Sequence, residues 1–122
     1  MHDYCDFGVR VMKVEDLTVV ALSGEWDVLA RDALHDVLLA TDLANDIVID
    51  ARAASFFDSS ALSQFVTFFK LVTERGRRFE LLAGNSNILR MLEITNLAEV
   101  LLPPPDRQAF LEEHIPPMPA TA

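Results

Sequence analysis

Apolar and polar residues alternate at the start of the chain. In residues 7–14, every second position from Phe7 to Val11 is apolar. This period of two predicts a half-buried strand at or near the edge of a sheet. Glu15 and Asp16 then provide a short turn, and the β-branched run 17–22 predicts a second, more deeply buried strand. The two strands are therefore expected to pair antiparallel.

From residue 29 the apolar positions are spaced by three or four residues instead of two. This spacing predicts a helix with one buried face. Asp27 stands just before it and is able to cap the helix by accepting hydrogen bonds from the free amides of the first turn. The predicted buried face consists of Ala30, Ala33, Leu34, Val37 and Leu38.

The middle of the chain repeats the change from strand to helix. Residues 46–50 are apolar with charged ends, which is typical of an interior parallel strand. Residues 51–57 are expected to form a loop, and the polar group 58–60 to begin a helix. Gly76 ends that helix, because glycine adopts the left-handed conformation of a helix end at low cost. Its predicted buried stripe is Leu62, Phe65, Val66, Phe69 and Val72.

The last third of the chain predicts another strand at 79–83 and a helix capped by Ser86. Asn96 is a suitable left-handed end for that helix. A short strand at 100–102 and a helix at 106–114 complete the expected order. The pattern predicts one α/β domain with a mixed, mainly parallel sheet of about five strands and four helices. We expect the domain to span residues 1–115, followed by a flexible tail rich in proline and alanine at 116–122.

Charge narrows the choice of partners. The 122 residues carry a net charge of −9, and residues 1–60 contain 12 acidic against 4 basic side chains. Such a surface repels nucleic acid and anionic lipid, and it attracts a partner with a basic face. The alternative is that the acidity only keeps a small protein soluble. The apolar stretches are too short to cross a bilayer, no secretory signal is evident, and a single cysteine, Cys5, fits a reducing compartment. The expected location is the cytoplasm.

The segment 56–62 is the most distinctive local feature. It follows an interior strand and opens a helix, which is where parallel α/β folds present functional groups. A phosphate on a serine at a helix amino terminus is favoured by about 0.3–1 kcal/mol. It also adds a charge of about −1.5 to −2 at a place where a partner is able to dock. The alternative is that Asp58, Ser59 and Ser60 only cap the helix.

Three segments in the right order resemble the STAS domains of bacterial anti-sigma factor antagonists. Residues 24–27 are similar to the Gly-Glu-aliphatic-Asp element of that family, and residues 58–62 to its Asp-Ser-Ser-Gly-Leu element, with Ala61 in place of glycine. Residues 89–97 are similar to its third-helix segment, with Asn96 in place of glycine. The resemblance covers about residues 7–113.

The resemblance implies a phosphorylation switch. In this family the serine after the aspartate accepts a phosphate from the anti-sigma factor, which is itself a kinase of the histidine-kinase-like ATPase type. That position is Ser59 here, with Ser60 as the second choice. The unphosphorylated protein binds the kinase and frees a sigma factor, phosphorylation releases the kinase, and a phosphatase is a further possible partner. The residues expected to contact the partner are Asp27, Asp58, Ser60, Glu25 and Phe57.

Two functions stay open at this stage. One is the phosphorylation switch, and the other is a STAS docking subunit of a signalling or transporter-associated complex that is never phosphorylated. An enzyme is not expected, because the chain has neither a Gly-x-Ser-x-Gly elbow nor a glycine-rich phosphate loop. No cofactor and no metal are expected either, since His2, His35 and His114 lie far apart in the sequence.

Overall fold

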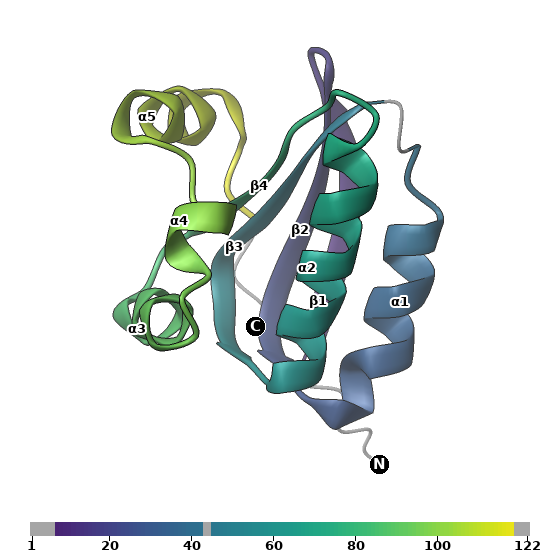
Figure 1. The fold of residues 1–122 in the computed structure, drawn as a ribbon, viewed down its shortest axis with the longest axis vertical. Helices are drawn as coiled ribbons and strands as arrows, with labels where there is room; N and C mark the ends of the chain where they lie inside the picture. The colour runs from purple at the N-terminus through teal and green to yellow at the C-terminus, as the bar shows by residue number, and fades with distance from the viewer. Residues whose placement is uncertain (1–6, 43–44, 119–122) are drawn as a thin grey trace.

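Four strands form one sheet in the described part of the chain, in the order β1-β2-β3-β4. The computed structural model describes residues 7–42 and 45–118 (Figure 1). β1 is antiparallel to β2, whereas β2, β3 and β4 are parallel to one another. The elements are β1 (Phe7–Val14), β2 (Leu17–Trp26), the 3-10 turn η1 (Val28–Ala30), α1 (Arg31–Leu39), β3 (Asp46–Phe57), α2 (Ser59–Thr73), β4 (Phe79–Ala83), α3 (Ser86–Ile94), α4 (Ala98–Leu101) and α5 (Pro105–His114).

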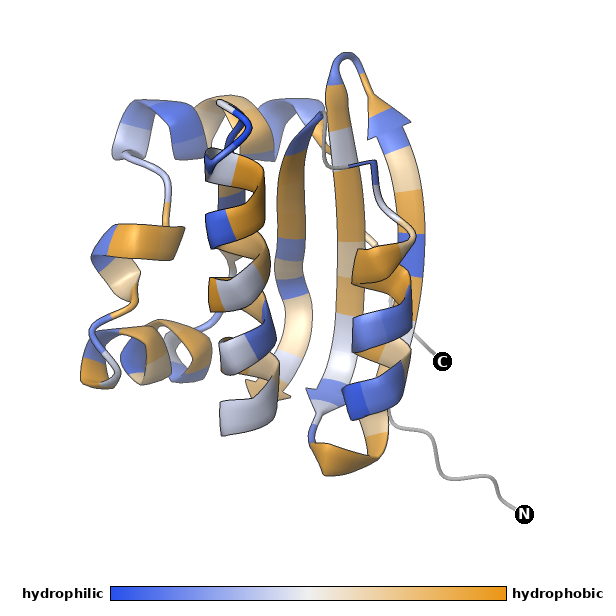
Figure 2. Ribbon diagram, turned by 45° about the vertical axis from the view of Figure 1, so that its right-hand side comes forward, coloured by the Kyte–Doolittle hydropathy of each residue, from blue (hydrophilic) through white to orange (hydrophobic). Residues whose placement is uncertain are grey.

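Helices α1 and α2 lie side by side over one face of the sheet (Figure 1). Their apolar sides turn toward the strands, and β2 and β3 are apolar along much of their length (Figure 2). Burying these faces together supplies the main hydrophobic stabilisation of the domain. The largest side chains of this core are Trp26, Phe57, Phe65 and Phe79.

A smaller apolar cluster occupies the other face of the sheet. Leu111 of α5 and Ile115 are almost completely buried there. They pack with residues from three strands, so the carboxyl-terminal helix completes the second layer. The strand residues of this cluster are Leu17, Val19, Val48 and Leu82. No helix within the described ranges combines the length and the apolar character needed to span a bilayer.

Several sequence predictions are confirmed. The first strand and β4 have the predicted bounds, and α2 begins directly after Asp58. Gly76 and Asn96 are left-handed, with φ angles of 75° and 62°. The interpretations of His2 and Cys5, and of tail residues 119–122, concern residues outside the described ranges. The described tail residues 116–118 contain neither helix nor strand.

The predicted loop at 51–57 is wrong, because these residues continue β3. They pair with the end of β2 from Ser23↔Ala53 to Trp26↔Phe57, with one register shift before these pairs and a second between Gly24 and Glu25. The alanine and serine residues of this segment give no strand pattern in the sequence, because neither residue type favours strands by itself. The pairing with β2 therefore determines the structure of this segment.

The predicted strand at 100–102 is also wrong, which leaves four strands in the described residues instead of about five. Leu101 ends the one-turn helix α4 and is fully buried. The left-handed Asn96 redirects the chain, and the Leu97 amide donates to the Leu92 carbonyl at 2.8 Å. This closure of α3 positions the next residues for a helical turn. With α4, the described chain has five α-helices instead of about four.

Two details of the helices also differ from expectation. α3 begins at Ser86, but its cap is Asn85, whose side chain accepts from the Ile88 amide at 2.9 Å. In α2, Phe68 is 3% exposed and belongs to the core, whereas Val66 and Phe69 are only partly buried.

Gly84 allows a close approach of two backbone segments. A Cβ atom at this position would lie 2.8 Å from the Cα atom of Arg52. We expect Gly84→Ala to lower the free energy of unfolding by about 1–3 kcal/mol, because the backbone must shift to admit the methyl group. Urea denaturation measures the change, with the exposed Ser86→Ala as the control, expected within about 0.5 kcal/mol. An unchanged midpoint for Gly84→Ala would contradict the proposed crowding.

Candidate functional site

The carboxyl ends of β2 and β3 lie side by side and bring two acidic residues together. Trp26 and Phe57 are register partners at these ends. Asp27 and Asp58 follow them directly, and the Asp58 amide donates to the Trp26 carbonyl at 3.1 Å. A register shift after Gly24, whose φ angle is 80°, sets the alignment of the last two pairs. The segments 24–27 and 58–62 therefore meet at the carboxyl ends of β2 and β3.

Asp58 caps α2. Its Oδ1 atom accepts from the Ala61 amide at 3.0 Å and from the Ser60 hydroxyl at 2.7 Å. Both bonds orient the carboxylate toward the helix and satisfy one of the amides that a helix start leaves free. The Ser60 hydroxyl is thus held in place, in a half-buried position.

Ser59 is the first residue of α2 and is exposed. Its hydroxyl has no hydrogen-bond partner among the residues that the structure describes. It opens onto a groove of about 430 Å³ between α2 and the segment after α3. The other residues that line this groove are Leu62, Ser63, Val66, Thr67, Thr95 and Leu97. A free hydroxyl at a helix amino terminus is suited to accept a phosphate.

Asp27 holds the turn that follows β2. Its Oδ1 atom accepts from the Leu29 amide at 2.9 Å, and its carbonyl accepts from the Ala30 amide at 3.0 Å. The predicted cap is therefore found, although it caps the 3-10 turn η1 and not α1 itself. Glu25 is exposed two residues earlier. Within the described ranges, none of Glu25, Asp27 and Asp58 forms an ion pair, so their charges face any partner uncompensated.

Phe57 does not lie on the surface, contrary to the prediction that it contacts a partner. Its side chain is 0% exposed and packs edge-on against Phe65, with 5.0 Å between the ring centroids. Successive side chains of a strand point to opposite faces, so Phe56 points outward instead and is 40% exposed. Trp26 is likewise part of the core, and its indole N–H donates to the Ser23 carbonyl at 2.9 Å.

The prediction missed two exposed aliphatic residues at this end of the molecule, Val28 and Leu29. They form η1, between the Asp27 cap and α1. The sequence did contain a signal for their exposure. Both residues precede Ala30, the first residue of the predicted buried face, so they lie outside the helical pattern that marks burial.

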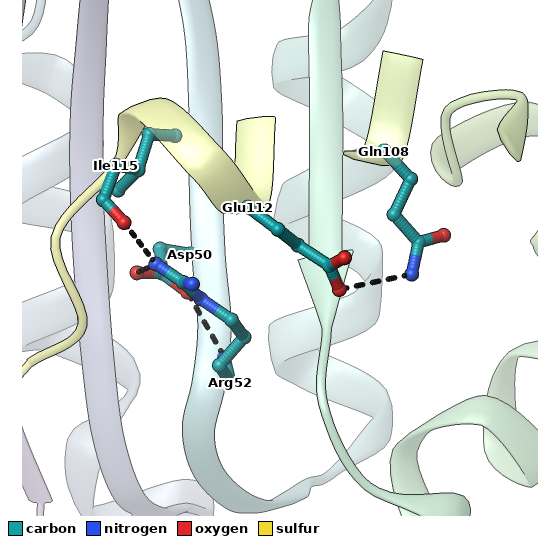
Figure 3. Close-up of polar contacts among 5 residues, drawn as sticks. All are labelled: Asp50, Arg52, Gln108, Glu112 and Ile115. Atoms are coloured by element: carbon teal, nitrogen blue, oxygen red, sulfur yellow. Dashed lines mark hydrogen bonds and ion pairs between the residues drawn. The ribbon is translucent and has the colours of Figure 1, made fainter. Parts of the chain in front are cut away.

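A buried ion pair that was not predicted lies on the other face of the sheet (Figure 3). Asp50 is 2% exposed, and both of its oxygens accept from the Arg52 guanidinium at 2.9 Å. The guanidinium also donates to the Ile115 carbonyl at 2.9 Å. The hydrogen bond with Asp50 raises the pKa of Arg52, and the charges of Asp50 and Glu112 add to this against the effect of burial. This cluster joins Ile115, the residue after α5, to β3.

The described ranges contain no group of three or more His, Cys, Asp or Glu side chains arranged to hold a metal ion.

Comparison with known proteins agrees with this architecture. The STAS domain family model matches residues 9–113. The anti-sigma-B factor antagonist of Bacillus subtilis (strain 168) is 28% identical over 97 residues, which cover 79% of this chain and 89% of that protein. The chain belongs to the STAS domain family.

Three solved structures show the same fold. An anti-sigma factor antagonist from Mycobacterium paratuberculosis has a TM-score of 0.68 at 22% identity, covering 85% of this chain and 92% of that one. The anti-sigma factor antagonist SpoIIAA in its unphosphorylated form has a TM-score of 0.67 at 17% identity, and the match covers 87% of this chain and 96% of that one. The phosphorylated form of SpoIIAA from Bacillus has a TM-score of 0.57 at 16% identity, and the match covers 87% of this chain and 99% of that one.

Proposed function

We propose that this protein is an anti-sigma factor antagonist that binds an anti-sigma factor kinase of the histidine-kinase-like ATPase type. Binding takes place while Ser59 is unphosphorylated and frees a sigma factor for transcription. Phosphorylation of Ser59 by the kinase ends the interaction, and a phosphatase restores it. The protein acts in the cytoplasm as a regulatory binding protein and not as an enzyme.

The observation that carries this proposal is the state of the Ser59 hydroxyl. It is exposed and, among the described residues, free of hydrogen bonds, and it stands at the first position of a helix. The partial positive charge of the helix start stabilises an added phosphate there, so α2 stays folded. SpoIIAA, which shares this fold, has been solved with and without phosphate.

Geometry also supports Ser59 over Ser60 as the acceptor. The Ser60 hydroxyl donates to the Asp58 cap at 2.7 Å and is half-buried. Phosphorylating it would break this bond and place the phosphate against the Asp58 carboxylate. Ser59 accepts the same group without losing a hydrogen bond within the described structure.

Release follows from the lost fit and the desolvation cost that a phosphate brings to the site. The site already presents Glu25, Asp27 and Asp58 without ion-pair partners in the described residues. A phosphate on Ser59 adds about −1.5 to −2 charges beside them. A partner surface fitted to the neutral hydroxyl then loses both fit and favourable desolvation, so the complex dissociates.

Substitution of Ser59 tests the switch. We expect Ser59→Ala to bind the kinase as the wild type does, because little surface is lost, whereas Ser59→Glu weakens binding tenfold or more because its larger, charged side chain disturbs the fit and must lose its water. Pull-down from lysate of the source bacterium, with mass spectrometry of captured and bait proteins, identifies the kinase and the phosphorylated residue. Calorimetry with the purified kinase then measures affinity.

Ser60→Ala is the matched control for the acceptor. It removes the hydroxyl next to Ser59 and should still be phosphorylated, with phosphate recovered on Ser59. Equal binding of one partner by wild type, Ser59→Ala and Ser59→Glu, with no phosphate on any serine, would refute the switch. That result would assign the domain to a docking subunit that is not phosphorylated.

A further inference from the structure

The 3-10 turn η1 presents two aliphatic side chains to solvent. Val28 is 59% exposed and Leu29 80%, the highest value among the exposed large apolar residues of the described chain. The turn lies at the lower end of the molecule, where its ribbon has the colour of hydrophobic residues (Figure 2). Apolar surface that stays exposed in the folded protein gains no stabilisation from burial, and it gains this stabilisation when another molecule covers it.

The turn is held rigidly, although it lies on the surface. The Asp27 side chain accepts from the Leu29 amide, and the Asp27 carbonyl accepts from the Ala30 amide. Ala30 is 1% exposed and anchors the end of the turn in the core. Beyond it, the Gln64 side chain donates to the Arg31 carbonyl at 3.1 Å and ties the start of α1 to α2. Little conformational freedom is therefore lost when a partner covers the turn.

The turn lies at the same end of the sheet as Ser59. It follows β2, whose last residue Trp26 pairs with Phe57 at the end of β3, and α2 begins two residues later. The start of α2, the ends of both strands and the turn meet at the lower end of Figure 1. The exposed apolar side chain of Phe56 lies at the same end, paired in register with Glu25.

We propose that Val28 and Leu29 form the apolar anchor of the surface that binds the anti-sigma factor kinase. The partner surface is an apolar recess that receives Leu29 and is rimmed by basic side chains that face Glu25, Asp27 and Asp58. This inference rests on the proposed function, and it adds a determinant of affinity that is separate from the phosphate acceptor.

Charge favours the kinase over a second copy of the chain as the occupant. A two-fold dimer places the same patch of each copy in contact. The unpaired carboxylates that flank the turn would then meet their own equivalents, and like charges in contact oppose association. A basic partner neutralises the same carboxylates, so an acidic rim around an apolar anchor selects a basic surface.

Truncation of Leu29 tests the proposal. We expect Leu29→Ala to raise the Kd for the purified kinase, first identified with wild-type and Ser59→Ala baits, by about tenfold or more, as for a central apolar anchor. Leu39→Ala is the matched control, since Leu39 is 60% exposed at the opposite end of α1 and should leave the Kd unchanged. Urea denaturation of all variants verifies that they are folded.

The possible outcomes separate the two proposals. If wild-type protein binds no kinase, the proposed function fails. If wild type and Ser59→Ala bind the kinase and Leu29→Ala binds it equally well, only the anchor is refuted. Sedimentation equilibrium gives a further outcome. Self-association of the wild type that Leu29→Ala abolishes, with kinase affinity unchanged, would assign the turn to a second copy and overturn the proposal.

Discussion

Arg52→Met is expected to lower the free energy of unfolding by about 3 kcal/mol, the lower end of the range for a broken buried ion pair. The substitution leaves the Asp50 carboxylate without its cation at a position that is only 2% exposed. It also removes the hydrogen bond to the Ile115 carbonyl, which ties the end of α5 to β3. The Arg52 side chain is 20% exposed, so water is able to relieve part of the cost.

Denaturation with urea, followed by circular dichroism, measures this effect. Replacing both members of the pair, as in Asp50→Leu with Arg52→Met, should recover most of the loss, because no buried charge remains. Arg31→Met is the surface control. It removes a pair whose side chains are 56% and 93% exposed, and it should change stability by less than about 1 kcal/mol. If Arg52→Met also lowers the free energy of unfolding by less than about 1 kcal/mol, Asp50 finds another partner in the variant.

The effect of Arg52→Met should be the same at pH 6 and pH 9. The pKa of Arg52 is raised in the folded protein by its hydrogen bond with Asp50. A raised pKa gives stability that is complete below the pKa of the unfolded state, which for arginine lies well above pH 9, and is lost only as the pH rises through the pKa of the folded state. The guanidinium is thus fully charged throughout this range.

Phe57→Ala is expected to lower the free energy of unfolding by about 3–5 kcal/mol. The side chain is fully buried, and it packs against Phe65 in the core between the sheet and α2. Truncation removes apolar contacts and leaves a cavity that the surrounding side chains are unable to fill completely. The same denaturation experiment measures the change.

Phe56→Ala provides the control, because it removes the same side chain one residue earlier. Phe56 is 40% exposed, so the expected loss is about 1 kcal/mol or less. The ratio of the two losses tests which phenylalanine faces the core. A larger loss for Phe56→Ala than for Phe57→Ala would mean that the strand has the opposite register.

Much of the fold could be predicted from local patterns in the sequence. The alternation in β1, the apolar run of β4 and the polar start of α2 each reflect the environment of the element itself. The left-handed Asn96 was also predictable from its residue type and its place after a helical stripe. The capping role of Asp58, and its place beside Asp27, followed from the order of elements together with the family resemblance.

The errors arose where distant residues decide the structure. The end of β3 is held by its pairing with β2, and the register shifts at Ala21/Ser23 and Gly24/Glu25 determine which side chains face the core. No local pattern contains these shifts, so the choice between Phe56 and Phe57 was not predictable from either residue alone. The pair of Asp50 and Arg52 depends on α5, which begins more than fifty residues later.

The double role of Asp58 affects how related sequences are interpreted. Its carboxylate caps the amino terminus of α2 and also places a negative charge beside Ser59. The capping role alone favours an aspartate at this position in a relative that has no serine after it, and the same argument applies to Asp27 at its own turn. Under the proposed function, the residue after the aspartate therefore distinguishes a phosphorylation switch from a docking subunit. Among substitutions of Asp58, Asp58→Asn separates the role of the charge from the role of the cap, because asparagine caps a helix as well as aspartate does.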